Sequence, residues 1–187
     1  MEITNEFAVA RPVETVWDFF QDVPSVAQCL PGAELTEDKG DGAYTGSISV
    51  KLGPMSATFE GEATVVPDAA AKTGAISGKG ADRRGGSRGQ VEVEYRLAAI
   101  DSGTMVTVDA DVKLSGAAAR FGRTNLINEM STRLIDEFVA CLEKKLAAAT
   151  SEEAAAVSAR EVRGFTLFFT SLGSSIAHFF KRLFGRE

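Results

Sequence analysis

An alternation of apolar and polar residues between Ala33 and Ser115 constrains the fold of this chain more than any other feature. Apolar side chains alternate with charged or hydroxyl side chains over residues 44–52, 91–99 and 106–114. A period of two is typical of strands with one buried and one wet face. Because glycine-rich turn signals separate the runs, we expect the strands to pair antiparallel.

Helical patterns flank the strands. A first strand over residues 2–10 is followed by Pro12, which suits the first turn of a helix, and by one apolar face at Val13, Val16, Trp17 and Phe20. A second short helix is expected over residues 25–30, and a long helical stretch after Gly116, to about residue 149. The predicted class is α+β: a curved antiparallel sheet of about seven strands around a long C-terminal helix, plus an amphipathic tail helix.

Composition excludes several classes of function. The net charge of −6 argues against general nucleic-acid binding, and His178 is the only histidine. We therefore expect no catalytic residues, no metal site and no enzymatic activity. Cys29 and Cys141 are expected to be buried as small apolar side chains, since two cysteines cannot build a disulfide framework. With no export signal, the expected compartment is the cytoplasm.

Several short motifs resemble one known family. They are Cys29-Leu30-Pro31-Gly32-Ala33-Glu34, Lys51-Leu52-Gly53-Pro54, Phe59 with Gly61, and Asp109-Ala110-Asp111-Val112. They resemble the carbon monoxide dehydrogenase CoxG family of the START-like (SRPBCC) helix-grip superfamily, over roughly residues 2–148. The resemblance implies a membrane-linked accessory protein of a molybdenum-containing CO-dehydrogenase-type enzyme.

Small residues at inward positions of the predicted sheet suggest a hollow between sheet and long helix. Larger residues would form its walls and bind an apolar ligand, with Tyr44 or Tyr95 offering a hydroxyl to a carbonyl. The expected ligand-binding residues are Trp17, Phe20, Tyr44, Phe59, Tyr95, Phe121, Met130 and Leu134. The alternative is a filled core, in which the glycines mark bends of the sheet.

Composition changes near residue 150, which divides the chain into a helix-grip domain (1–149), a linker (150–161) and a tail (162–187). Six of the twelve phenylalanines lie in the tail, and its apolar residues recur at helical spacing. The opposite face carries hydroxyl groups and His178. The expected membrane-binding residues are Phe165, Phe168, Phe169, Leu172, Ile176, Phe179, Phe180, Lys181, Arg182, Leu183 and Phe184.

Three interpretations of the tail remain open: an interfacial helix, a transmembrane span, and a further core helix. The interfacial helix is favoured, because phenylalanines enter the acyl boundary while Lys181 and Arg182 meet anionic headgroups. A span of 21 residues would be long enough, yet its hydroxyl face would need partners in lipid.

The leading hypothesis is a membrane anchor and carrier on the cytoplasmic side of the cell membrane. It would hold a lipophilic ligand, with a respiratory quinone (menaquinone or ubiquinone) as the specific expectation, and carry it or recruit the dehydrogenase to the membrane. No covalent cofactor is expected. The alternatives are a ligand-free anchor or assembly factor, and a cyclase- or hydrolase-like enzyme.

Overall fold

The computed structural model describes residues 1–52, 55–82, 84, 86–123, 126–148 and 151–158. Its elements are β1 (Glu2–Val9), α1 (Val13–Gln21), α2 (Val23–Cys29), β2 (Ala33–Gly40), β3 (Ala43–Leu52), β4 (Met55–Asp68), β5 (Thr73–Asp82), β6 (Ser87–Ile100), β7 (Gly103–Ser115), η1 (Gly116–Arg123), α3 (Leu126–Ala147) and α4 (Ser151–Ala156). The order of elements agrees with the one expected from the hydrophobic pattern.

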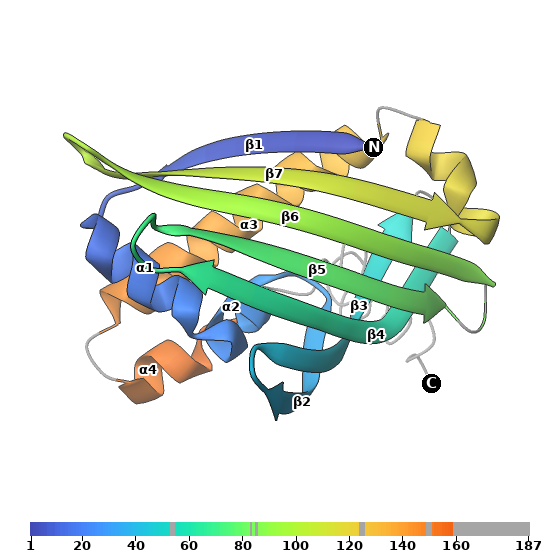
Figure 1. Ribbon diagram of the computed structural model, residues 1–187, viewed down its shortest axis with the longest axis horizontal. Coiled ribbons are helices and arrows are strands. Elements are labelled where there is room, and N and C mark those ends of the chain that lie inside the picture. Colours follow the sequence, from blue (N-terminus) through green and yellow to red (C-terminus); the bar gives the residue numbers. More distant parts are fainter. Residues whose placement is uncertain (53–54, 83, 85, 124–125, 149–150, 159–187) are drawn as a thin grey trace, which may run out of the picture.

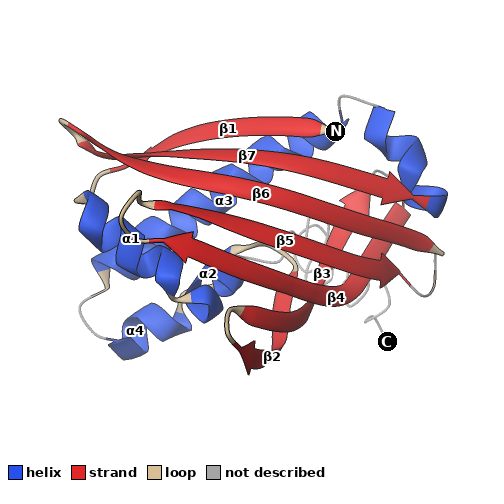
Figure 2. Ribbon diagram, viewed as in Figure 1, coloured by secondary structure: helices blue, strands red, loops and turns tan. Residues whose placement is uncertain are grey.

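The seven strands form one antiparallel sheet in the order β1-β7-β6-β5-β4-β3-β2. Each strand from β2 to β6 is joined to the next one by a hairpin. β1 pairs with β7 and forms an edge of the sheet (Figure 1). Figure 2 shows α3 running behind the sheet, with α1 and α2 near one of its ends. The predicted helix-grip arrangement is confirmed.

A row of glycines marks where the sheet bends. Gly46, Gly61, Gly80 and Gly89 are direct partners across four neighbouring strands. A Cβ atom at Gly61 would overlap the carbonyl oxygen of Lys79, so the backbones of β4 and β5 approach too closely for a side chain there. At Gly61 the two strands therefore approach in a way that a larger residue would prevent.

The helical stretch expected after Gly116 is divided into two elements. Residues 116–123 form the 3-10 helix η1, and the α-helix begins only at Leu126. Gly116 has a φ of 71°, and a Cβ atom there would overlap the carbonyl oxygen of Gly86. The chain therefore turns at Gly116 before the long helix starts.

The expected linker, residues 150–161, contains the short helix α4. Lys145 on α3 donates from Nζ to the carbonyl oxygen of Ala154 at 2.8 Å, and Val157 packs against the core. The chain is therefore tied to the body as far as Val157. The tail from residue 162, with all its expected membrane-binding residues, lies outside the described residues.

Candidate ligand-binding site

The strand register determines which side chains face α3. Tyr44, Ala63, Gly78, Val91 and Val112 are aligned partners on neighbouring strands and form one inward row. Inward residues are apolar or small in this row, whereas their neighbours along each strand are polar and exposed. The predicted alternation is thus confirmed, and the inner face is almost free of charge.

The inner face is tightly packed at one end. Here α1, α2 and the second half of α3 meet strands β1, β6 and β7. The first cluster of buried side chains comprises Val9, Val16, Trp17, Phe19, Cys29, Tyr95, Leu97, Val106, Phe138, Cys141 and Leu142. Each has an exposed fraction of 7% or less, so this end is a filled core.

A smaller second cluster lies at the other end, where η1 meets the sheet. Ala118 is fully buried there, and Phe59, Leu114 and Met130 pack against it. The backbone N–H of Ala118 donates to the hydroxyl of Ser87, which is itself buried, at 3.0 Å. This bond fixes η1 over the end of the β5–β6 hairpin.

Between the two clusters, inward side chains of the central strands are only half-buried. Val65, Ile76, Val91 and Val93 remain partly exposed, although they lie in the middle of the sheet. On α3, Leu134 is likewise half-buried, one turn before the buried Phe138. These apolar side chains therefore keep part of their surface exposed, as binding of a lipophilic ligand would require.

The structure distributes the expected ligand-binding residues over all three regions. Trp17, Phe20 and Tyr95 belong to the packed end, with the rings of Phe20 and Tyr95 5.1 Å apart. Phe59 and Met130 belong to the second cluster, and Tyr44 and Leu134 are half-buried and lie in neither. Phe121 lies in η1, and its side chain is outside the described part.

Sequence reasoning missed several residues of this site. Phe19 and Phe138 join the aromatic contacts of Phe20, with the rings of Phe19 and Phe138 6.3 Å apart. Val65, Ile76 and Val93 were not among the expected ligand-binding residues, and each is half-buried. The alternation over residues 91–99 placed Val93 on the inner face, and only the packing shows that it stays partly exposed.

Tyr95 has a buried hydroxyl group without a hydrogen-bond partner in the described part of the chain. Its exposed fraction is 4%, and burial raises the pKa of Tyr95, an effect that the nearby Gln21 amide opposes. The Gln21 amide itself donates to the Trp17 carbonyl oxygen at 3.4 Å. Such an unpaired donor is costly in an apolar surrounding, so it is suited to a carbonyl group of a ligand.

The ring of Tyr95 is positioned by its cross-strand partner, Gly74. A Cβ atom at Gly74 would overlap Cζ and Oη of Tyr95, so the ring occupies the space that a side chain would need. We expect Gly74→Ala to lower the free energy of unfolding by about 1–3 kcal/mol, through overpacking. Urea unfolding followed by circular dichroism measures this.

Gly89→Ala is the matched control for Gly74→Ala. The nearest atom to a Cβ atom at Gly89 is Cδ2 of Leu114, at an ordinary contact distance of 3.5 Å. This substitution should change the free energy of unfolding by less than about 1 kcal/mol. Equal unfolding midpoints for the two variants would contradict the placement of the Tyr95 ring.

Cys29 and Cys141 form a disulfide bond, with their Cα atoms 5.4 Å apart. Both are buried, as expected, but the expectation of two separate cysteines is wrong. The fold brings the end of α2 against the second half of α3, although the two residues are 112 positions apart. The cysteine count therefore gives no argument for a reducing compartment.

Lys145 lies one helical turn beyond the disulfide on α3 and joins three helices. Its Nζ donates to Oε1 of Gln28 on α2 at 2.7 Å and to the carbonyl oxygen of Ala154 on α4. Its exposed fraction is 6%, and burial lowers the pKa of Lys145, with Asp22 opposing the shift. The disulfide and the hydrogen bonds of Lys145 together hold α2 and α4 against α3 at the packed end.

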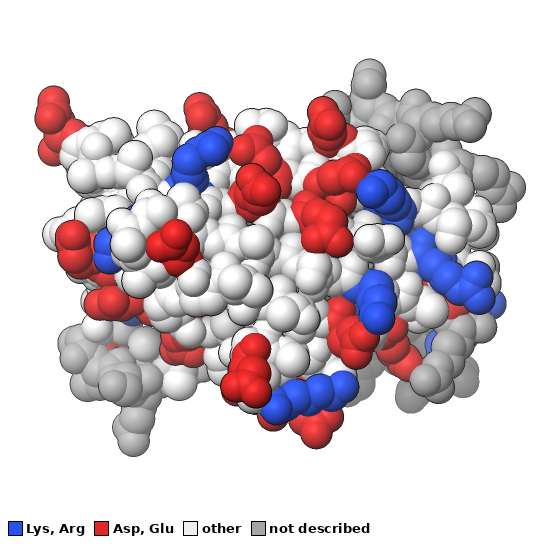
Figure 3. All heavy atoms as spheres, in the orientation of Figure 1, with Lys and Arg blue, Asp and Glu red and all other residues white. Residues whose placement is uncertain are grey.

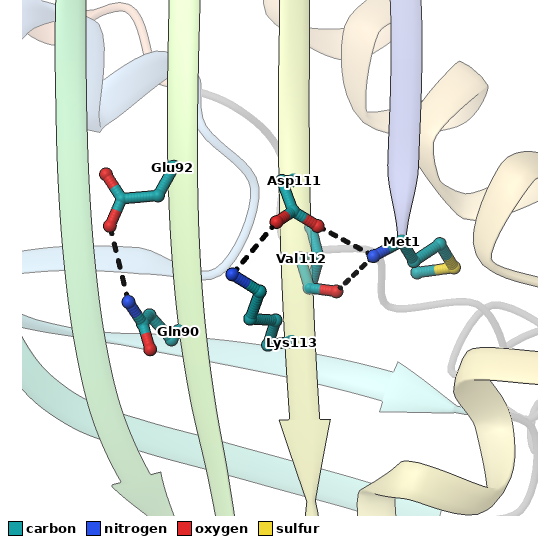
Figure 4. A network of polar contacts seen from close by, with 6 residues as sticks. All are labelled: Met1, Gln90, Glu92, Asp111, Val112 and Lys113. Atoms are coloured by element: carbon teal, nitrogen blue, oxygen red, sulfur yellow. Dashed lines mark hydrogen bonds and ion pairs between the residues drawn. The ribbon is translucent and has the colours of Figure 1, made fainter.

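The outer face of the sheet is charged (Figure 3). Glu2, Asp111 and Glu92 are direct partners on β1, β7 and β6, and such like charges repel. The Met1 amino group lies 2.7 Å and Lys113 Nζ 3.1 Å from the Asp111 carboxylate (Figure 4). The Met1 amino group, followed by Lys113, lowers the pKa of Asp111.

Two hollows open on this outer face. The larger, of about 790 Å³, lies over the glycine row and is lined by charged side chains such as Glu62, Lys79 and Lys113. The smaller, of about 350 Å³, lies beside Gly74 and is lined by Arg96 and Asp109 among others. Residues of the strands alone line both hollows, so neither lies between the sheet and α3.

A model of the carbon monoxide dehydrogenase CoxG family matches residues 6–147. The chain belongs to this family. CoxG proteins are accessory to the dehydrogenase, so family membership associates the chain with CO dehydrogenase. The resemblance seen in the short motifs is confirmed over nearly the whole described domain. A search of curated proteins found no match to the sequence.

Solved structures share the fold of this CoxG domain. A conserved protein from Geobacillus kaustophilus is 18% identical with a TM-score of 0.69, over 79% of this chain and 95% of that one. The Zhui aromatase/cyclase from Streptomyces sp. R1128 is 17% identical with a TM-score of 0.54, over 80% and 96%. Ara h 8.0201 is 14% identical with a TM-score of 0.50, over 75% and 95%. At these identities the likeness concerns the fold alone.

In the part of the CoxG chain that the structure describes, no helix combines the length and the hydropathy needed to cross a membrane.

Proposed function

We propose that this CoxG protein binds a lipophilic ligand, specifically a respiratory quinone, between its sheet and α3. It carries the ligand, or recruits the dehydrogenase, to the inner face of the cell membrane through its tail. The half-buried apolar side chains between the two clusters carry this proposal. The first cluster fills one end of this region, η1 covers the other end at Ala118, and the side chains between them keep part of their apolar surface exposed.

A quinone suits this region for two chemical reasons. Its isoprenoid chain matches Val65, Ile76 and Leu134, and its carbonyl oxygen can accept a hydrogen bond from a tyrosine. Burial raises the pKa of Tyr44, with Asp38 adding to the effect, and it also raises the pKa of Tyr95. Both hydroxyls therefore stay protonated donors at neutral pH.

The direct test is solvent extraction of protein purified from its native host, followed by mass spectrometry. A stoichiometric isoprenoid quinone is the expected result. Protein that carries no isoprenoid at all would count against the carrier function and favour the second candidate.

The second candidate is a ligand-free anchor or assembly factor, and the charged outer face favours it. Glu2, Asp111 and Glu92 lie side by side on this face, and such an acidic row suits a basic partner. A protein that binds the dehydrogenase equally well with and without quinone would fit this candidate. An enzymatic role, as the name of the Streptomyces neighbour suggests for that protein, has no supporting observation in the described residues.

Tyr95→Phe separates ligand binding from stability. Removing the hydroxyl should weaken quinone binding about 5–10-fold, because one hydrogen bond is worth about 1 kcal/mol. The unfolding midpoint should stay equal or rise, since an unpaired buried hydroxyl is lost. Quenching of Trp17, the single tryptophan, by added quinone reports binding, because the Trp17 ring lies 6.4 Å from that of Tyr95.

Tyr44→Phe is the control for the second hydroxyl. If Tyr44→Phe weakens quinone binding and Tyr95→Phe does not, the quinone carbonyl accepts its hydrogen bond from Tyr44 instead.

A further inference from the structure

The sheet has two edge strands, and they differ in how their open edges are protected. β2, at one edge, pairs with β3 in a register that shifts twice, between Leu35 and Glu37 and between Asp38 and Gly40. β1, at the other edge, pairs with β7 over Glu2–Val9 without any shift (Figure 1). This strand contains no proline and no lysine. Because bulges, prolines and lysines are what stop edge strands from pairing further, β1 is the less protected edge.

The hydrogen bonds to β7 determine which backbone groups of β1 point to the open edge. Met1 and Val112 exchange two hydrogen bonds through their main-chain atoms, of 2.8 and 2.9 Å. In an antiparallel pair, such residues alternate with residues whose N–H and C=O groups point away from the partner strand. The open groups therefore belong to the even-numbered residues Glu2, Thr4, Glu6 and Ala8. All four residues are exposed, so another strand can reach these groups from solvent.

The inward side chains of β1 are arranged symmetrically about Asn5. Two apolar residues precede it on this face, Met1 and Ile3, and two follow it, Phe7 and Val9. Asn5 is half-buried, and its amide makes no hydrogen bond within the part of the chain that the structure describes. A second asparagine amide can satisfy it, since each amide group carries both donors and an acceptor.

Charge selects one register for pairing β1 with a second β1. The open backbone groups match only if even-numbered residues lie opposite even-numbered residues. In an antiparallel pair centred on Asn5, Thr4 lies opposite Glu6 of the second copy, and Glu2 lies opposite its Ala8. Centring the pair on Thr4 would instead set Glu2 against Glu6, and centring it on Glu6 would set two copies of Glu6 against each other. Since directly opposed like charges destabilise a sheet, only the register centred on Asn5 is free of such a conflict.

We infer that two copies of this chain pair through β1, antiparallel and about a two-fold axis at Asn5. The open residues of the two strands then form about eight interchain hydrogen bonds, and the two sheets continue as one. Ile3 and Phe7 each pack against a cluster of their own domain yet stay half-buried, and in the dimer they lie opposite one another. Both copies of α3 lie on the same side of the joined sheet. The pairing depends neither on a bound ligand nor on a membrane.

Disulfide trapping in the full chain tests the register. Asn5→Cys is the probe, because the two copies of position 5 face each other with Cα atoms about 4.5 Å apart, a distance that a disulfide can bridge. Thr4→Cys is the matched control, since this position is more exposed but its two copies lie diagonally, about 7–8 Å apart. The native cysteines are bonded to each other and buried. With diamide as oxidant, Asn5→Cys should give at least about fivefold more covalent dimer than Thr4→Cys on a non-reducing gel.

Sedimentation velocity of the full chain without oxidant measures the association itself. The wild-type chain should sediment as a dimer at micromolar concentration. Asn5→Asp sets two carboxylates against each other at the axis and should raise the Kd of the dimer at least about tenfold. Thr36→Asp introduces the same charge on the other edge strand, β2, and should leave the Kd unchanged.

Three results would overturn the inference. They are a wild-type chain that stays monomeric at micromolar concentration, a covalent yield from Thr4→Cys that equals or exceeds the yield from Asn5→Cys, and a dimer that Asn5→Asp leaves intact. Circular dichroism shows whether each variant is folded. If Asn5→Asp does not fold, Thr4→Glu takes its place, because it sets a carboxylate opposite Glu6 of the second copy and should weaken the dimer in the same way.

Discussion

Reduction of the Cys29–Cys141 disulfide is expected to lower the Tm by roughly 5–15 °C. A disulfide stabilises a fold by about 2–4 kcal/mol, more for a long loop, and each kcal/mol corresponds to roughly 2–4 °C in a domain of this size. The loop closed here spans 112 positions, which includes all strands from β2 to β7. Thermal unfolding with and without a thiol reductant measures the shift.

The effect should be localised at the packed end. The disulfide joins α2 to α3 beside the bonds of Lys145 to Gln28 and Ala154, so its loss should release α4 first. Hydrogen exchange of residues 151–157 should therefore accelerate before that of the strands.

The double variant Cys29→Ala/Cys141→Ala is the control, because its Tm should not respond to the reductant. Thiol titration of the unfolded wild-type chain, prepared without reductant, should find no free cysteine. Two free thiols, together with a Tm that the reductant leaves unchanged, would refute the bond.

Replacing Phe168 and Phe180 together by aspartate is expected to abolish binding of the protein to lipid vesicles. Each phenylalanine contributes about 1.5–3 kcal/mol when buried in an apolar phase, so two lost side chains weaken binding at least about 100-fold. Flotation with zwitterionic vesicles at high salt measures this loss, because those conditions screen the attraction of Lys181 and Arg182 for headgroups.

Thr170→Asp with Ser174→Asp introduces the same charge on the polar side of the tail pattern. If the tail lies in the membrane interface, this control should float like the wild type, since its polar side stays in water. If the tail spans the bilayer, the control should lose binding too, because a carboxylate at mid-membrane costs about 2.5–3.5 kcal/mol. Normal flotation of the phenylalanine variant would refute both membrane interpretations.

The strands could be predicted because their signal is local. In a strand, neighbouring side chains point to opposite faces, so burial of one face leaves its period of two in the sequence. Residues 91–99 therefore indicated β6, and the glycine-rich turn signals indicated the hairpins between strands. The division of the helical stretch at Gly116 was less visible, since it depends on the contact between Gly116 and Gly86.

The candidate site could be predicted only in part. Eight residues were expected to bind a ligand, and this stays a prediction; Trp17 and Tyr95 lie in the first cluster, and Phe20 packs against it. Size and polarity indicate that a residue faces inward, but how far it is covered depends on elements distant in sequence. The unpaired hydroxyl of Tyr95 has no sequence signal at all, because its surroundings are built by elements distant in the sequence.

Local periodicity and turn residues alone determined the class of this fold, the order of its elements and the apolar character of both the inner face and the tail. Long-range packing decided the rest: the pairing of Cys29 with Cys141, the Lys145 contacts among three helices, and the half-buried apolar side chains between the two clusters. The reason is physical. The residues next to a position in the sequence set its backbone conformation and the face to which its side chain points. Its partners and its remaining exposure are set by side chains that only the folded chain brings near.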